Sequence, residues 1–173
     1  MTISATTTRK GIIMSTQITA EPGGQEIVIT RDFDASPELV FRANTEPDLL
    51  AQWMGPHRLS MEVDTYDVRD GGRWRFIHRE PGGAEYGFRG VFHGMPSIDG
   101  IVRTFEFEGA AGHVSLETLV FEDLGNGRTR LRANAVYQSV EGRDAMVESG
   151  METGVNEGYE RLDELLASLA PTP

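Results

Sequence analysis

The stretch from Asp144 to Leu169 is the only long segment of the chain with helical periodicity. Its apolar positions recur at alternating spacings of four and three residues, which places them on one stripe of a helix: Met151, Val155, Gly158, Leu162, Leu165 and Leu169. Acidic residues fill most of the remaining surface, and Pro171 lies just beyond the last apolar position. The sequence therefore predicts one long amphipathic helix, which needs a partner to cover its apolar stripe.

Three glycines, Gly150, Gly154 and Gly158, stand four residues apart on this predicted helix. A glycine inside a helix costs about 1 kcal/mol relative to alanine, so the stripe needs a compensating role. One interpretation is close packing of the helix backbone on a sheet. The other is that the missing side chains leave room for a ligand between helix and sheet. A membrane-spanning GxxxG face is disfavoured because the flanking residues are acidic.

The first 25 residues are rich in Thr, Ser and Ala and show no apolar period. We expect residues 1–25 to be a disordered lead, followed by a single domain over residues 26–170. Met14 is a plausible alternative start.

The domain is predicted to begin with a strand and two short helices. Residues 26–34 are rich in β-branched side chains and alternate between apolar and polar positions, which is typical of a strand. Ser36-Pro37 and Glu46-Pro47 are typical of helix starts. From Leu59 the period changes to two, and glycine-rich turns divide the chain into six strands at 59–69, 73–79, 85–95, 101–108, 113–122 and 128–137. The predicted class is α+β, with the order β-α-α-β6-α.

The predicted strands have one aromatic face and one arginine-rich face. The arginines could pair across strands with Glu106, Glu108, Glu117 and Glu122, which would make a solvated outer surface. The aromatic face needs a cover, and the C-terminal helix can supply it. We therefore expect a curved antiparallel sheet wrapped around one long helix.

Composition excludes several classes of function. The chain has 27 acidic and 16 basic residues and a formal net charge of -11, which repels nucleic acid and anionic membranes. There is no cysteine, so disulfides and thiolate chemistry are excluded. No apolar run has the length of a transmembrane segment or the form of a signal peptide, so a cytoplasmic location is expected.

Several segments together resemble a known family: TRDFDASPELVFRANTEPDLLAQWMGP, DGGRWRF, EYGFRGVFHGM, TFEFEG and GMETGVNEGYERLDELL. They are similar to the activator of heat shock protein 90 ATPase homologue-like family, of the C-terminal-domain type, within the SRPBCC or START-like superfamily. The resemblance covers residues 25–170. It implies a helix-grip fold, as in START domains and the birch pollen allergen, with an internal cavity for an apolar ligand. The family name also implies a role in stress response.

Motifs for catalysis are missing from the sequence. The four histidines, His57, His78, His93 and His113, have no metal-ligand spacing, so no metal and no cofactor are expected. His78 shares strand parity with the aromatic face and either enters the cavity or is an ordinary strand-end residue. Trp53 and Met54 belong either to the core or to the rim of a cavity. The same two interpretations apply to Met146 and Met151.

Three functional hypotheses remain. The first is a non-enzymatic binding protein for a small apolar molecule of the lipid, polyketide or aromatic class. The second is an interaction protein with a chaperone or homodimer partner, and the third is a cyclase or hydrolase that uses His78, Tyr86 or Tyr159 as acid–base groups. The residues predicted to line the cavity are Trp53, Met54, Trp74, Phe76, His78, Tyr86, Phe88, Phe92, Phe105, Met151, Gly154, Val155, Gly158 and Tyr159.

Overall fold

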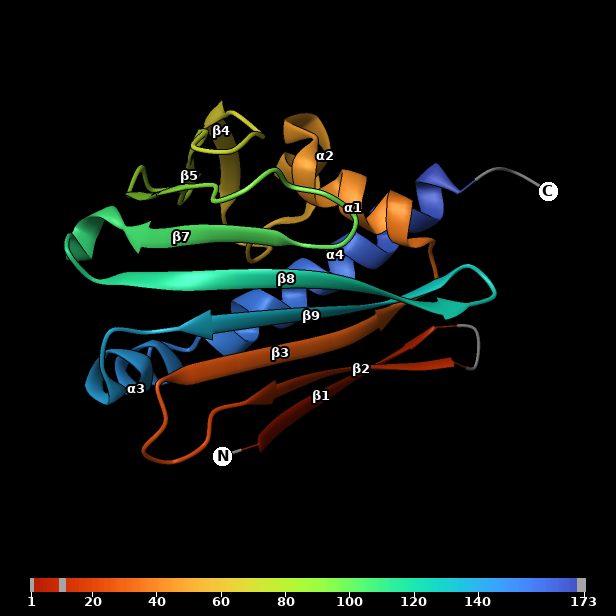
Figure 1. The fold of residues 1–173 in the computed structure, drawn as a ribbon, viewed down its shortest axis with the longest axis horizontal. Coiled ribbons are helices and arrows are strands. Elements are labelled where there is room, and N and C mark those ends of the chain that lie inside the picture. The colour runs from red at the N-terminus through yellow and green to blue at the C-terminus, as the bar shows by residue number, and fades with distance from the viewer. Residues whose placement is uncertain (1, 10–11, 171–173) are drawn as a thin grey trace.

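The computed structural model describes residues 2–9 and 12–170, and side chains from residue 16 onward. The described residues form one nine-stranded antiparallel sheet in the order β1-β2-β3-β9-β8-β7-β6-β5-β4. The strands are β1 Thr2–Arg9, β2 Ile12–Thr19, β3 Glu26–Phe33, β4 Ser60–Tyr66, β5 Arg73–Arg79, β6 Glu85–Val91, β7 Ile101–Phe107, β8 Val114–Gly125 and β9 Arg128–Val136. The predicted α+β class and helix-grip architecture are confirmed, and Figure 1 shows helix α4 crossing one face of the sheet.

Two short helices, α1 (Pro37–Thr45) and α2 (Pro47–Trp53), follow β3 as predicted. Ser36 caps α1 by accepting a hydrogen bond from the amide of Leu39 at 3.4 Å. The indole of Trp53 donates to the carbonyl oxygen of Ala43 at 2.8 Å, which fixes α2 against α1. Residues 53–56 then lie against α4 at Gly154 and Gly158.

The C-terminal helical segment is broken into α3 (Val140–Glu148) and α4 (Met151–Leu169), whereas the sequence predicted one helix over residues 144–169. The break lies at Gly150, whose φ of 82° is in the left-handed region that favours glycine. In α4, Leu162 and Leu166 are buried against the sheet, and Val155 packs on the same core. The apolar stripe is therefore covered by the sheet along most of its length, and Leu169 at its end is exposed.

The N-terminal residues differ from the disordered lead that the sequence predicted. Strand β2 pairs with β3, and the side chains of Thr16, Ile18 and Ala20 are buried. Ile18 packs in a cluster with Met146 of α3 and with Met151 of α4. The expectation of disorder was wrong here because the apolar partners of this strand lie far along the chain, where composition does not reveal them.

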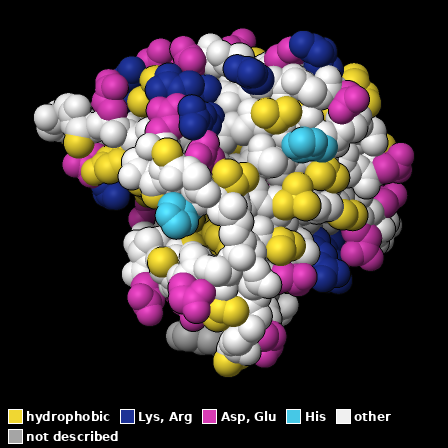
Figure 2. Space-filling model, turned by 60° about the vertical axis from the view of Figure 1, so that its left-hand side comes forward, with side chains coloured by type: hydrophobic (Ala, Val, Ile, Leu, Met, Phe, Trp, Pro, Cys, Tyr) yellow, Lys and Arg dark blue, Asp and Glu magenta, His cyan; other side chains and the backbone are white. Residues whose placement is uncertain are grey.

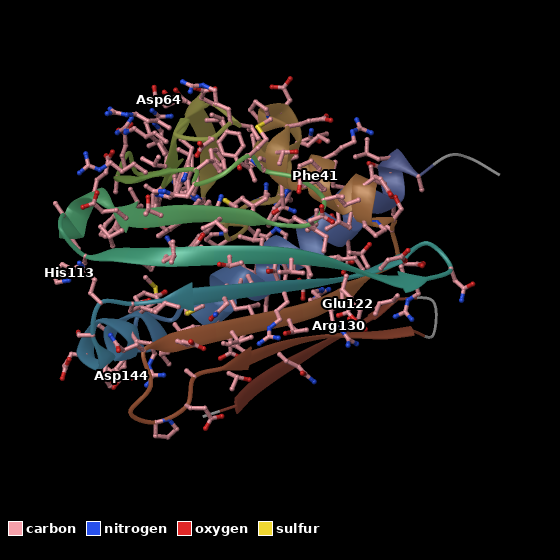
Figure 3. All side chains as sticks on the ribbon, in the orientation of Figure 1. Phe41, Asp64, His113, Glu122, Arg130 and Asp144 are labelled. Atoms are coloured by element: carbon pink, nitrogen blue, oxygen red, sulfur yellow. The ribbon has the colours of Figure 1, made fainter. Side chains whose placement is uncertain are left out.

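The outer face of the sheet carries ion pairs between arginine and acidic residues, as predicted. Arg89 pairs with Glu106 at 2.7 Å, and Arg75 pairs with Glu108 at 2.6 Å. Glu122 and Arg130 are register partners at one end of β8 and β9 (Figure 3). Glu117 was wrongly assigned to this surface, since it pairs with the buried Arg103 on the inner face.

Candidate functional site

A cavity of about 330 Å³ lies between the inner face of the sheet and helix α4. Its wall is formed by β3, by strands β5 to β9, by the turn after α2 and by residues of α3 and α4. Most of these side chains are aliphatic or aromatic. Figure 2 shows hydrophobic side chains gathered on one face of the molecule, with acidic and basic side chains around them.

The structure brings most of the predicted site residues together in this wall. The end of α2 and the turn after it contribute Trp53 and Met54. The sheet contributes Phe76, His78, Phe88 and Phe105, and α4 contributes Met151, Gly154, Val155, Gly158 and Tyr159. Trp53 is also buried in the core, so its two proposed roles coexist. Met146, which the sequence left open, lines the cavity as well.

Three predicted residues lie outside the cavity wall. Trp74 is fully buried and stacks on Phe76 with ring centroids 5.0 Å apart, and Phe92 packs edge-on against Tyr66 in the core. The hydroxyl of Tyr86 donates to a carboxylate oxygen of Glu80 at 3.1 Å. Strand parity placed these residues on the correct face, but it could not show how far along the face the cavity extends.

The two glycines within α4 have different surroundings. At Gly154 the nearest heavy atom to an added Cβ is Cδ of Pro56 at 3.8 Å, so this position is open. At Gly158 an added Cβ would lie 3.4 Å from the backbone of Trp53 and of Gly55. Gly158 thus packs against the turn after α2 rather than against the sheet. The open position at Gly154 fits the interpretation that the missing side chain leaves room for a ligand. Gly158 fits the close-packing interpretation, but its partner is the turn after α2 and not the sheet.

His78 is a buried polar group in the cavity wall. Its ring lies edge-on to Phe76 and Phe88, with centroids 5.4 Å apart in each pair. An added Cβ at Gly55, where φ is +97°, would clash with this ring. Burial, together with the nearby charge of Arg161, lowers the pKa of His78 to about 4. The imidazole is therefore neutral at pH 7 and is a weak base.

A buried ion pair in the same wall was missed by the sequence analysis. Arg103 of β7 and Glu117 of β8 are register partners, and Nε of Arg103 donates to Oε2 of Glu117 at 2.9 Å. The guanidinium also lies 4.9 Å from the ring centroid of Trp74. Although burial opposes it, the charge of Glu117 and the neighbouring Tyr66 raise the pKa of Arg103. Arg103 lies two residues before the predicted site residue Phe105 in β7, and this shared strand parity is the signal that could have revealed it.

Two tyrosines, Tyr137 and Tyr159, and two asparagines, Asn44 and Asn134, also belong to the polar part of the wall. Burial raises the pKa of both hydroxyls above the ordinary value, so both stay protonated at neutral pH. Tyr137 was also missed as a site residue, as were the inward-facing residues Ile27, Ile29, Asn44, Leu119, Leu131, Ala133 and Ala135. Most of these belong to strands whose faces the sequence had separated correctly.

The described residues offer few other possibilities for chemistry. No group of three His, Asp or Glu side chains within residues 16–170 is arranged to hold a metal ion. None of the helices in the described part of the chain could span a membrane. The arrangement is suited to enclosing an apolar molecule and to forming a small number of hydrogen bonds with it.

Solved structures of similar fold come from several bacteria. A protein from Rhodobacter sphaeroides has 29% sequence identity and a TM-score of 0.80, over 90% of this chain and 100% of that chain. A protein from Arthrobacter aurescens has 25% identity and a TM-score of 0.79, over 88% and 92% of the two chains. The AHSA1 protein from Silicibacter pomeroyi, at 22% identity, has a TM-score of 0.70 over 84% of this chain and 99% of its own.

No curated protein matches this sequence. Residues 34–167, which run from the end of β3 nearly to the end of α4, match the family described as activator of Hsp90 ATPase homolog 1-like protein. This match and the solved structures agree with the helix-grip architecture. The chain therefore belongs to the AHSA1 family.

Proposed function

We propose that this protein is a non-enzymatic binding protein for a small apolar molecule of the lipid, polyketide or aromatic class. The observation that carries the proposal is the cavity of about 330 Å³ beneath α4, with its largely apolar wall. Sites for small molecules typically have volumes of about 300 to 1,000 Å³ and combine an apolar wall with a few convergent polar groups. The cavity has both properties.

The polar residues of the cavity favour binding over catalysis. With a pKa of about 4, His78 has little capacity to take up a proton at neutral pH. Tyr159 has its pKa raised by burial, which opposes its ionisation, and Tyr86 lies outside the wall. The three groups considered for acid–base catalysis thus do not form a working pair. The chaperone role is supported by the description of the family rather than by a feature of the surface.

A thermal-shift screen with lipids, polyketides and aromatic compounds tests the proposal. A ligand that binds only the folded state stabilises it by about 2.7 kcal/mol at a concentration of 100 Kd. We expect a subset of apolar compounds to raise Tm in proportion to the logarithm of their concentration, with no chemical turnover. Turnover of a stabilising compound would favour the enzyme hypothesis, and a screen without any stabilising compound would contradict binding.

A further inference from the structure

The cavity wall contains one pair of opposite charges. Among the described residues that line the cavity, Arg103 is the one arginine or lysine and Glu117 is the one aspartate or glutamate. The side chain of Arg103 is 8% exposed and that of Glu117 is 20% exposed, so both charges are largely removed from water. Because they are joined directly at 2.9 Å, their charges cancel within the wall.

The charged groups nearest to the wall do not change this balance. Arg31, whose guanidinium lies 5.9 Å from the ring centroid of Tyr159, is paired with Asp163. Arg161 acts on His78 from outside the wall, where its guanidinium donates to the carbonyl oxygens of Gln52 and Gly55. The interior that faces a ligand therefore has no net charge.

We infer that the ligand is an uncharged molecule with an apolar body and a hydroxyl or carbonyl group, and that the Arg103–Glu117 pair binds this polar group. The inference rests on the proposed function. A carboxylate would have to compete with Glu117 for Arg103, and an ammonium group would have to compete with Arg103 for Glu117. Either ion would leave a buried charge without a full partner, which is strongly unfavourable.

The ion pair retains capacity for hydrogen bonds to a neutral group. A guanidinium has five N–H donors and a carboxylate has about four acceptor positions. The bond between Arg103 and Glu117 uses one of each, and Tyr66 is a further partner of the guanidinium. A ligand hydroxyl could accept from Arg103 and donate to Glu117. A ligand carbonyl could accept from Arg103. Hydrogen bonds to charged partners are stronger than neutral ones, so a single polar group suffices to orient the ligand.

Three ligands with one alkyl chain isolate the effect of charge: 1-octanol, octanoate and octylammonium. Their affinities are measured at pH 7 by displacement of the uncharged fluorophore N-phenyl-1-naphthylamine, in salt high enough to screen the net charge of -11. We expect 1-octanol to bind at least tenfold more tightly than either ion. The cation serves as an internal control, because any attraction to the acidic protein that the salt leaves unscreened would favour it.

The variant Glu117→Gln removes the negative charge from the cavity and leaves Arg103 positive. Octanoate should then gain at least tenfold in affinity, and octylammonium should lose affinity. Glu106→Gln is the matched control, since Glu106 pairs with Arg89 on the outer face and its loss changes the net charge equally. This control should behave as the unmodified protein does. The double variant Arg103→Gln with Glu117→Gln restores a neutral cavity and should again prefer 1-octanol.

The possible outcomes separate this inference from the proposed function. Equal affinities for 1-octanol and octanoate in the unmodified protein would overturn the inference while leaving the binding function intact. An equal gain of octanoate affinity in Glu117→Gln and Glu106→Gln would overturn it as well. If Glu117→Gln does not fold, the relative affinities for 1-octanol and the two ions in the unmodified protein and in the double variant still test the inference. No displacement of the fluorophore by any of the three compounds would overturn the proposed function together with the inference.

Discussion

Gly150 and Gly154 lie four residues apart and should respond in opposite ways to the same substitution. Gly154→Ala should stabilise the protein by a few tenths to about 1 kcal/mol, because helix propensity improves and an added Cβ meets only Pro56, at 3.8 Å. Gly150→Ala should destabilise it by about 1 to 2 kcal/mol, because its φ of 82° is unfavourable for a residue with a side chain. Denaturant unfolding of both variants measures whether each substitution raises or lowers the unfolding free energy. Destabilisation by Gly154→Ala would refute open space at that position.

His78 should make the stability of the protein depend on pH. In the unfolded chain the imidazole takes up a proton below about pH 6.5, whereas in the folded protein its pKa is about 4. The contribution of the neutral His78 to the unfolding free energy is therefore fully present above about pH 6.5. It is lost as the pH falls toward 4, by an amount on the order of 2–3 kcal/mol.

The contribution of His78 is obtained by difference. Unfolding free energies are measured at pH 7 and pH 4.5 for the unmodified protein, for His78→Gln and for His113→Gln, an exposed control. We expect the loss of stability on acidification to be smaller in His78→Gln than in the other two proteins. Equal losses in all three would show that His78 is not held neutral by the fold.

At the scale of elements, β2 is the part of the fold that the sequence analysis misjudged. Ile18 is 3% exposed and packs with Met146 and Met151, so Ile18→Ala should lower the unfolding free energy by about 2 to 4 kcal/mol. Gln17→Ala, on the exposed side of the same strand, should change it by less than about 0.5 kcal/mol. Urea unfolding of the two variants compares them, and equal small effects would mean that β2 does not contribute to the core.

Most elements could be predicted because their signals are local. Alternation along β5, the capping residue Ser36 and the proline at the start of α2 depend on neighbours a few residues away. Pairing of β2 with β3 depends on a partner strand and on α3 and α4, which lie far along the chain. The break at Gly150 was missed for a different reason, since a glycine with four-residue spacing fits both a continuous helix and its end.

The candidate site likewise has features with a local signal in the sequence and features that depend on residues far along the chain. The aromatic wall at Phe76 and Phe88 follows from strand parity, which the sequence contains directly. The Arg103–Glu117 pair depends on the register between β7 and β8, and charge alone suggested that Glu117 would face solvent. The volume of the cavity depends on how closely α4 approaches the sheet, and no residue pattern reports that distance.

At the scale of the whole molecule, the two faces of the sheet differ in character, and the Arg103–Glu117 pair is an ion pair on the largely apolar inner face. The inner face of the sheet and α4 line the cavity, while arginine and acidic side chains pair across the outer face. Strands β5 to β9 and all but the last two residues of α4, which build most of the cavity wall, lie within the residues that match the AHSA1 family. The central claim is that an apolar ligand occupies this cavity.

A titration with N-phenyl-1-naphthylamine tests that claim most directly when a cavity-filling variant is compared with a matched control. Gly154→Leu places a side chain in the cavity wall, and Thr153→Leu places the same side chain on the exposed surface one residue away. We predict saturable binding at one site in the unmodified protein and in Thr153→Leu, and at least a tenfold loss of affinity in Gly154→Leu with its unfolding free energy maintained. Equal affinities in all three proteins would place the fluorophore elsewhere and contradict the account.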